Sequence, residues 1–267
     1  MIIDFHTHCF PDTLAPRAME SLKKTFATGG FTKVYTDGTA ASAKEALSKN
    51  GIDRAVVCNI ATNAHQEHKV NDFAIALKAD PFFYPLGSVH PDSERVEEEL
   101  SRLAEAGIKG IKLHPDYVRV PITDPRMDRI LSALEARGMF CVMHAGYDPI
   151  SPDRIHATPE MLRETIDRHP NLTLIAAHMG GFAQARGVLE HLVGTNIYFD
   201  TSLCSLRPDE REELIEILNR HGEDRLLFGT DTPWSDSKAE IEFLEGVGLS
   251  RERLERIYCK NAQRLIG

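Results

Sequence analysis

Short apolar runs alternate with amphipathic stretches along the whole chain. Eight of these runs read as strands, and they cover residues 1–6, 54–60, 82–90, 108–114, 139–145, 172–178, 197–202 and 225–231. Their apolar residues are nearly continuous, which is typical of parallel strands that are buried on both faces. The pattern therefore predicts an α/β protein built on a parallel sheet.

The amphipathic stretches carry start and stop residues of helices. Residues 92–107 ("DSERVEEELSRLAEAG") begin with a Ser-Glu pattern and end at a glycine. Residues 124–138 and 158–170 begin with Asp124 and Thr158 as N-cap residues, and a proline follows each cap. Such residues at these places predict helices between the strands.

Eight strands that alternate with helices predict a (β/α)8 TIM barrel. A length of 267 residues suits a single domain of this kind, spanning residues 1–267. A doubly wound open sheet is the alternative, but neither GxGxxG nor GxxxxGK[ST] follows any of the strands. Residues 11–50 are longer than a normal crossover. We expect a helix, a loop around residues 28–40 ("TGGFTKVYTDGTA") and a second helix there, and the loop is a candidate lid.

Charge and cysteine content narrow the classes of function. The net charge is −9, from 31 basic and 40 acidic residues, which disfavours nucleic acid and membrane surfaces as partners. The five cysteines form no CxxC pair, so we interpret them as reduced thiols of a cytoplasmic protein. We expect no secretory leader, and no apolar run reaches the roughly 18 residues of a membrane span.

Ionisable residues stand where the predicted strands end. His6 and His8 follow the first run, and later strands end in His90, Lys112, His114, His144, His178, Asp200 and Asp231. In a barrel the carboxyl ends of all strands surround one mouth, which is where active sites of this fold lie. Burying such a group without a partner costs several kcal/mol, so we expect these side chains to meet in a shared site.

The histidines and the last aspartate of this set predict a metal site. His6 and His8 are two residues apart, so they point to the same side of their strand. We expect His144, His178 and Asp231 to approach the same ion from strands across the mouth. Nitrogen and oxygen donors without thiolate suit one Zn²⁺ ion with an open position, with Mn²⁺ or Fe²⁺ as alternatives. A hydrogen-bonded polar network without metal is the simpler alternative.

Three further strand-end residues receive several interpretations. His90 and His114 are candidates for contact with a substrate or for orienting a metal ligand. Lys112 is expected to face inward. It could pair with Asp200 or Asp231, bind a substrate carboxylate, or be carbamylated and bridge to a second metal ion. The sequence does not choose among these roles.

Four strand motifs together resemble the amidohydrolase superfamily. They are "DFHTH", "VMHAG", "AAHMGG" and "LLFGTDTPW", and the closing "IYCKNAQRLIG" resembles the final helix of the family. The resemblance is greatest to the amidohydrolase-2 branch, which contains aminocarboxymuconate-semialdehyde decarboxylase and related metal-dependent hydrolases. It implies a distorted barrel with one divalent metal ion, usually zinc. The first motif begins at residue 4, so we expect no accessory N-terminal β-domain of the kind that many amidohydrolases have, which is a departure from the family pattern. The implied metal ligands are His6, His8, His144 and Asp231, and His178 corresponds to the residue that activates the metal-bound water.

The leading hypothesis is a metal-dependent hydrolase. Metal-activated water would attack an ester, lactone or amide bond of a small polar molecule, with His178 or Asp231 moving the proton. The alternative is non-oxidative decarboxylation of an aromatic or muconate-type acid. This reaction needs a basic anchor for the acid, and the candidates are Lys112, Arg119, Arg154 and Arg207.

Two further hypotheses carry less support. A TatD-like metal-dependent nuclease would carry a glutamate on the fourth strand, where this chain has "GIKLHP". The acidic net charge also disfavours DNA as a substrate. A non-catalytic barrel would leave the strand-end residues without a chemical role. The resemblance further suggests a homodimer, and specificity is expected to come from the loops, including 116–123 and 146–158.

Overall fold

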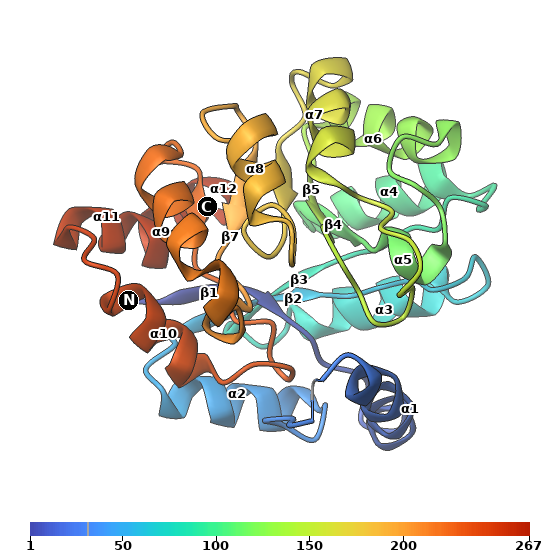
Figure 1. Ribbon diagram of the computed structural model, residues 1–267. Helices are drawn as coiled ribbons and strands as arrows, with labels where there is room; N and C mark the ends of the chain where they lie inside the picture. Colours follow the sequence, from blue (N-terminus) through green and yellow to red (C-terminus); the bar gives the residue numbers. More distant parts are fainter. Residues whose placement is uncertain (31) are drawn as a thin grey trace.

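The computed structural model describes residues 1–30 and 32–267, and it contains the eight predicted strands (Figure 1). Each strand is shorter than the apolar run that predicts it, so most of the strand-end histidines lie just beyond the last residue of a strand. The strands are β1 (Ile3–Thr7), β2 (Arg54–Cys58), β3 (Phe83–Leu86), β4 (Gly110–Leu113), β5 (Phe140–Met143), β6 (Leu174–Ala176), β7 (Tyr198–Asp200) and β8 (Leu226–Leu227).

The strands pair in parallel and in sequence order. One run joins β1 to β3 and a second joins β4 to β8. Backbone hydrogen bonds connect the two runs at both seams. Lys112 N donates to Gly87 O at 2.9 Å between β3 and β4, and Phe5 N donates to Phe228 O at 2.7 Å between β8 and β1. The ring of strands is therefore continuous, which confirms the predicted TIM barrel.

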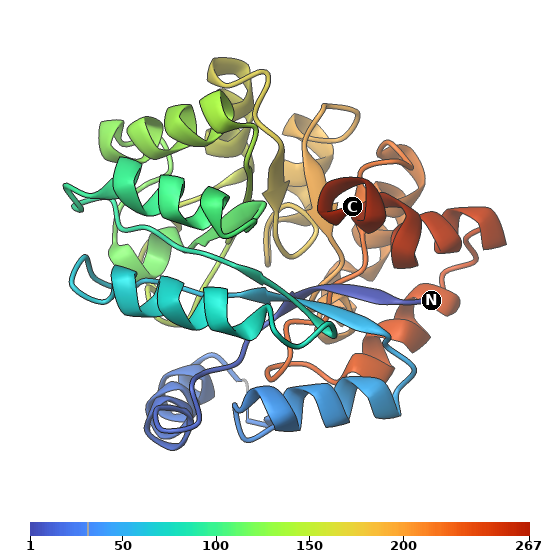
Figure 2. The same ribbon diagram turned by 180° about the vertical axis from the view of Figure 1, so that it is seen from behind.

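Helices surround the strands on the outside in both views of the molecule (Figures 1 and 2). They are α1 (Ala15–Thr28), α2 (Ala40–Lys49), α3 (Glu67–Leu77), α4 (Val96–Glu105), α5 (Pro115–Val118), α6 (Pro125–Arg137), α7 (Pro159–Arg168), α8 (Ala185–His191), α9 (Arg211–Arg220), α10 (Ser237–Glu245), α11 (Arg251–Glu255) and α12 (Asn261–Ile266). Short turns are the 3-10 helices η1 (Cys204–Leu206) and η2 (Pro208–Glu210) and the π-helical turn η3 (Arg256–Lys260).

The predicted helix caps are largely confirmed. The side chains of Asp124 and Thr158 accept hydrogen bonds from the backbone at the starts of α6 and α7. The helix predicted over 92–107 begins later, at Val96, after a turn in which Ser93 Oγ donates to the buried Glu67 and accepts from Arg95 N at 3.0 Å. The two helices predicted within residues 11–50 are α1 and α2. The candidate lid loop between them, 28–40, includes residue 31, which lies outside the described residues.

The strands present alternate residues to two apolar clusters. Phe5, Val142 and Ile175 belong to a smaller cluster inside the barrel, while their strand neighbours pack against the surrounding helices. The pairing register between β1 and β2 shifts between Asp4 and Thr7, which marks a β-bulge. The bulge allows Phe5 to fill the barrel interior while the next residue, His6, reaches the site at the top.

Two further expectations from composition concern the cysteines and membrane-spanning helices. All five cysteines are buried and unpaired. Among the described residues, no helix combines the length and the apolar character that crossing a membrane requires.

The buried carboxyl group of Glu240 links two loops near the site and makes stability depend on pH. It accepts hydrogen bonds from Ser205 after β7 and from Ser235 after β8. Burial raises the pKa of Glu240 from its ordinary 4.5 to about 7. The folded state therefore binds this proton more tightly than the unfolded chain, so the stabilisation is complete below pH 4.5 and is lost as the pH rises through about 7.

We predict that Glu240→Gln removes this component of the pH dependence. Between pH 4.5 and 8 the free energy of unfolding of the native protein should fall by on the order of 3 kcal/mol more than that of the variant. Urea unfolding of both proteins at the two pH values measures the difference. Parallel pH profiles for the two proteins would contradict the assignment.

Candidate active site

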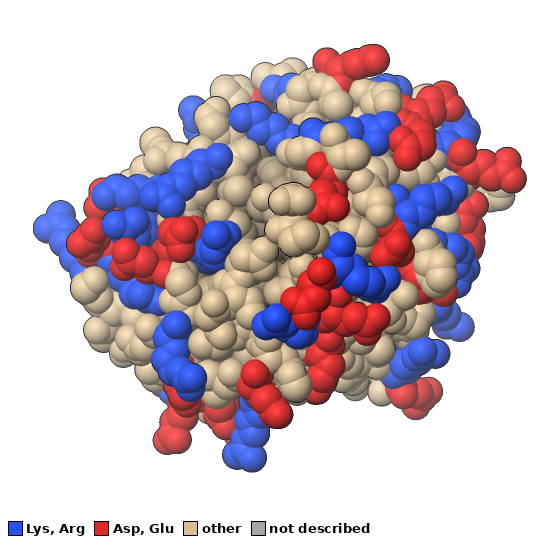
Figure 3. All heavy atoms as spheres, turned by 90° about the horizontal axis from the view of Figure 1, so that it is seen from above, with Lys and Arg blue, Asp and Glu red and all other residues tan. Residues whose placement is uncertain are grey.

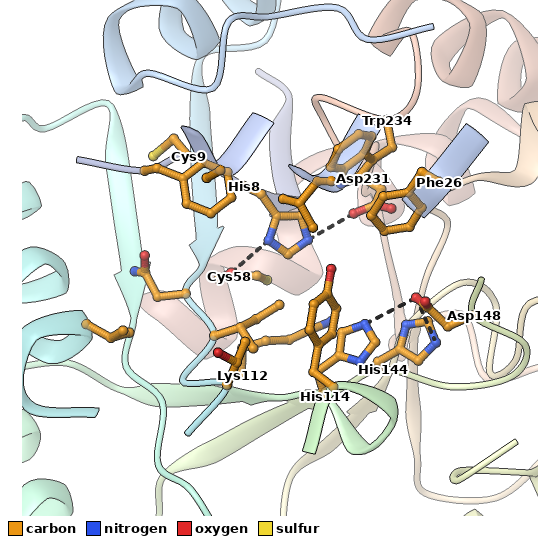
Figure 4. A pocket seen from close by; sticks show the side chains of 18 of the residues that line it. His8, Cys9, Phe26, Cys58, Lys112, His114, His144, Asp148, Asp231 and Trp234 are labelled. Carbon is orange, nitrogen blue, oxygen red and sulfur yellow. Dashed lines mark hydrogen bonds and ion pairs between the residues drawn. The ribbon is translucent and has the colours of Figure 1, made fainter. Parts of the chain in front are cut away.

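A cavity of about 590 Å³ opens at the carboxyl ends of the strands. Its floor holds most of the predicted site residues, namely His6, His8, Lys112, His114, His144, His178 and Asp231 (Figure 4). Its walls are mainly apolar and aromatic, and the aromatic side chains are Phe10, Phe26, Phe73, Tyr117, Tyr147, Phe182 and Trp234. The structure thus brings five predicted metal-binding residues to one end of one cavity.

His6 in β1 and His8 directly after it each contact a hydrogen-bond acceptor through Nδ1. His6 Nδ1 lies 2.8 Å from Asp200 Oδ2, and His8 Nδ1 lies 2.8 Å from the carbonyl oxygen of Cys58. Both partners are acceptors, so each Nδ1 carries the proton and each Nε2 presents a lone pair. Burial, and secondarily the charge of Lys112, lowers the pKa of His6 well below its ordinary value of 6.5, which keeps that imidazole neutral.

Asp231 meets the Nε2 atoms of both histidines. Its Oδ1 lies 3.0 Å from His8 Nε2 (Figure 4) and 3.5 Å from His6 Nε2. Lys112 Nζ lies 3.1 Å from the same His6 Nε2 atom. Donor atoms placed tetrahedrally around a zinc-like cation at about 2.0–2.2 Å lie about 3.3–3.6 Å apart, so small adjustments of these side chains would fit a divalent metal ion. Burial raises the pKa of Asp231, an effect that a bound cation would oppose.

His178 and His144 extend the donor set across the mouth. His178 Nε2 lies 3.1 Å from His144 Nδ1, and the His178 ring stacks on His6 with centroids 5.0 Å apart. Ser202 Oγ contacts His178 Nδ1 at 2.7 Å. Burial lowers the pKa of His178 and of His144 well below 6.5, so both rings are neutral and can act as ligands or accept a proton.

His178 and Asp231 both adopt a left-handed backbone conformation. Their φ angles are 57° and 65°, a region that residues other than glycine rarely occupy. Asp231 N donates to His6 O at 2.7 Å, and His178 N donates to Asp200 Oδ1 at 3.1 Å. These bonds hold the strained turns, so both side chains point into the mouth instead of continuing the strand direction.

Lys112 and His114 both line the cavity. Lys112 is fully buried, and its Nζ lies 3.1 Å from His6 Nε2, so its positive charge faces the converging lone pairs. His114 stacks face to face on His144 with centroids 4.0 Å apart, and its Nε2 lies 3.4 Å from Asp148 Oδ2. The structure therefore places Lys112 beside the first donor set and His114 beside a second group of acidic side chains.

Two predicted substrate contacts do not line the cavity. His90 is buried, its backbone N–H donates to Glu67, and its Nδ1 accepts from Asp92 N at 3.1 Å. It is directed to the turn before α4 because this turn supplies its partners. Arg154 is exposed on the loop after β5. The alternative anchors Arg119 and Arg207 do not line the cavity either.

Arg207 instead supports the backbone under His178. Its guanidinium donates to His178 O at 2.8 Å and to Gly181 O at 3.0 Å, and its Nε donates to Glu210 Oε2 at 2.7 Å. It is therefore a positioning residue for His178. The sequence reasoning saw its charge, but no local pattern indicated which carbonyl groups would receive its hydrogen bonds.

Sequence reasoning missed Asp116 and Asp148 as site residues. Both are buried beside His144, and each has one carboxylate oxygen 3.8 Å from His144 Nε2. They lie in loops that were expected to set specificity, but a loop aspartate is usually solvated. The signal that could have drawn attention to them is their place, two and four residues after the strand-end His114 and His144.

The first helix covers part of the cavity. Leu22 and Phe26 of α1 line it, and Phe26 packs on Trp234 with ring centroids 4.3 Å apart. This agrees with the prediction that residues 11–50 border the catalytic face. On the face seen in Figure 3, lysine, arginine, aspartate and glutamate side chains are interspersed, and no extended basic patch suited to a nucleic-acid backbone stands out.

Known proteins share the sequence pattern and the fold. The family model described as amidohydrolase (Amidohydro_2) matches residues 3–267. An uncharacterized TIM-barrel protein from Bordetella bronchiseptica has a TM-score of 0.78 at 20% sequence identity, with 99% of this chain and 98% of that chain covered. No curated protein sequence matches the chain.

Two further solved structures with a similar fold are named for the reaction of the enzyme. One is a 5-carboxyvanillate decarboxylase from Novosphingobium aromaticivorans, complexed with manganese and 4-hydroxy-3-methoxy-5-nitrobenzoic acid; its TM-score is 0.71 at 17% identity, with 100% of this chain and 96% of that chain covered. The other is a probable 2-pyrone-4,6-dicarboxylic acid hydrolase from Acinetobacter baumannii with citric acid bound, with a TM-score of 0.68 at 15% identity and coverage of 100% and 99%. At these identities the likeness shows the fold.

We predict that Arg207→Lys weakens metal binding more than it weakens the fold. A lysine can donate to one of the two carbonyl groups but cannot span both. Loss of a residue that orients a metal-binding group typically costs about 10–100-fold in affinity or activity. Titration with Zn²⁺ or Mn²⁺ measures the affinity, and a thermal melt measures the fold. Arg186→Lys, an exposed arginine on α8, is the control and should match the native protein. Equal metal affinity in the two variants would remove the positioning role.

Proposed function

The chain belongs to the amidohydrolase family, and from this premise we propose that it is a metal-dependent hydrolase. Its substrate would be a small molecule with an ester, lactone or amide bond. The convergence of His6, His8 and Asp231 on one point is the observation that carries the proposal. His144 and His178 border the same point and complete the set of residues that would hold the ion. When bound, a divalent cation polarises a carbonyl group and lowers the pKa of coordinated water.

The chain's own residues supply the proton transfer. Asp231 Oδ1 and His178 Nε2 both border the point where the donors converge, so either can take a proton from the attacking water and return it to the leaving group. Asp200 keeps His6 in one tautomer and, through the His178 backbone, fixes the second ring. Lys112 adds a buried positive charge on the floor, which favours a substrate that develops negative charge there.

The shape and lining of the cavity indicate the class of substrate. Aromatic and aliphatic side chains form the walls, while the polar groups gather on the floor. A ligand that fits this distribution has a flat apolar body and one polar end directed at the floor. Among the described residues that line the cavity, Lys69 and Lys112 are the basic ones, so the ligand would carry few anionic groups.

Decarboxylation of an aromatic or muconate-type acid is the second candidate. The favouring observation is that Lys112 is buried at the floor beneath aromatic walls, as an anchor for one carboxylate of a planar acid would be. The 5-carboxyvanillate decarboxylase with a similar fold acts on such an acid, according to its name. In this reaction Asp231 or His178 would protonate the carbon that loses CO₂ instead of activating water.

Several finer assignments belong to the same proposal. We propose Zn²⁺ as the native ion, because neutral imidazoles and a carboxylate suit it, with Mn²⁺ and Fe²⁺ as alternatives. The solved relative that contains manganese supports a divalent ion in general. The whole chain, residues 1–267, would act as one domain on a small molecule. A cytoplasmic location is supported by the five unpaired cysteines, and a homodimer remains an expectation from the family.

Metal removal tests the proposal directly. Dialysis against a chelator should lower the hydrolysis of aryl esters and lactones at least a hundredfold, and Zn²⁺ or Mn²⁺ should restore it. The same preparations are assayed for CO₂ release from hydroxylated benzoic acids. Release of CO₂ without hydrolysis would replace the first candidate by the second, and full activity in metal-free protein would refute both.

Asp231→Asn tests the residue that combines two roles. The amide has the same size but cannot take a proton and is a weaker donor to a cation, so kcat/KM should fall by about 10²–10⁴-fold. Metal analysis of the variant separates lost binding from lost proton transfer. Leu189→Met, a conservative change at a partly buried residue of α8 outside the cavity lining, serves as the control. Unaltered kcat/KM in Asp231→Asn would exclude this aspartate from the reaction.

A further inference from the structure

We propose that a second divalent cation binds beside the first site, between His114, Asp116, His144 and Asp148. This group lies on the opposite edge of the His144 ring from His178. It goes beyond the proposed function because its donors, apart from His144, take no part in the first site.

The distances between these side chains are those of donors that share an ion. His114 Nε2 lies 3.4 Å from Asp148 Oδ2, and His144 Nε2 lies 3.8 Å from the same oxygen (Figure 4). His144 Nε2 also lies 3.8 Å from Asp116 Oδ2. Separations of 3.4–3.8 Å are too long for direct hydrogen bonds. They are close to the spacing of about 3.3–3.6 Å between ligands placed tetrahedrally around a zinc-like ion.

The parallel stacking of the two imidazoles suits this arrangement. The rings of His114 and His144 are 4.0 Å apart with an angle of 10° between their planes, and their Nε2 atoms face the same carboxylate. The Nε2 atoms of these rings face two aspartate carboxylates at 3.4–3.8 Å, and no lysine or arginine belongs to this group of four side chains. A cation supplies the charge that this group otherwise lacks.

Three atoms of the group are buried and have no hydrogen-bond partner among the described residues, namely His114 Nδ1, Asp116 Oδ2 and His144 Nε2. The last two face the proposed site, and their parent side chains are almost completely buried. Leaving a buried polar atom unpaired costs about 1–3 kcal/mol, and more for a charged group. An ion bound between these two atoms removes this cost.

Neighbouring residues orient both carboxylates toward this point. Asp116 Oδ1 is held by His156 Nδ1 at 2.8 Å and by Ser151 Oγ at 3.0 Å, which leaves Oδ2 free. Asp148 Oδ1 accepts from Ile150 N at 2.7 Å, which likewise leaves its Oδ2 free. Such partners around a carboxylate are typical of residues that orient metal ligands.

His144 lies between the two sites. As a ligand of both ions it would be an imidazolate with one ring nitrogen for each ion, and its proton would be released to solvent on metal binding. Its Nδ1 lies 3.1 Å from His178 Nε2, whereas its Nε2 faces the two aspartates. The second site therefore borders the cavity, since His114, His144 and Asp148 line it.

Metal stoichiometry tests the proposal without an activity assay. The full chain is stripped with a chelator, titrated with Zn²⁺ or Mn²⁺, passed through a desalting column and analysed for metal. We expect two equivalents in the native protein and one in Asp116→Asn and in Asp148→Asn. Asp153→Asn changes an exposed aspartate in the same loop as Asp148 and should keep two. Thermal melts show whether each variant is folded.

His8→Ala separates the two sites. It should also bind one equivalent, and it should lose hydrolysis, because it disrupts the first donor set only. One equivalent in the native protein that His8→Ala loses and Asp116→Asn retains would overturn the second site while leaving the proposed function intact. One equivalent with the opposite pattern would retain the second site and refute the first. Two equivalents in a folded Asp116→Asn and a folded Asp148→Asn would also overturn the proposal.

Discussion

The top of the barrel is governed by an electrostatic constraint, since neutral imidazoles and carboxylates are buried together with too few protons to separate their lone pairs. Around Asp231, Oδ1 lies 3.0 Å from His8 Nε2 and 3.5 Å from His6 Nε2. When both imidazoles carry their proton on Nδ1, these contacts join acceptor atoms and are repulsive without a cation. Lys112 offsets part of this repulsion on one side of His6, and a divalent ion would offset the rest. The positions of the other residues around the mouth follow from this requirement.

The fold maintains this arrangement through strained turns. His178 and Asp231 leave their strands in the left-handed backbone region, which costs about 1–3 kcal/mol per residue. Arg207 and Asp200 hold the first turn, and the hydrogen bond from Asp231 N to His6 O holds the second. The last of these bonds also closes the barrel between β8 and β1. Barrel closure and ligand orientation are thus the same set of interactions at this seam.

The success of the sequence-based prediction follows from the same geometry. The eight apolar runs predict the strands because both faces of each strand are buried. An ionisable residue directly after such a run lies at the carboxyl end of a strand, and in a barrel these ends surround the mouth. His6, His8 and Asp231 could therefore be predicted from the chain alone. His90 could not be distinguished from them, because its local pattern is the same. Its partners are Glu67 on helix α3 and Asp92 on the turn before α4.

Residues that act through tertiary contacts were beyond reach of the pattern. Asp148 and Arg207 lie in loops and Asp116 lies in the one-turn helix α5. The role of each depends on tertiary contacts and not on its neighbours in sequence. A β-bulge adds a further limit, since strict alternation along β1 would place Phe5 and His6 on opposite faces. The shift in register lets both contribute to the barrel, one to its core and one to its site.

The floor of the cavity is polar and its walls are mainly apolar, and this difference bears on the reaction. The histidines, Asp231 and Lys112 gather at the strand ends, where Asp200 and the Cys58 carbonyl fix two of the imidazoles. The helices α1 and α3 and the loops contribute mainly apolar surface, with polar exceptions such as Ser21, Gln66 and Lys69. This distribution favours a substrate whose polar end is directed at the donor sets. Under the proposed function, hydrolysis and decarboxylation would both use this orientation, and they would differ in whether water or the substrate carboxylate occupies the position next to Lys112.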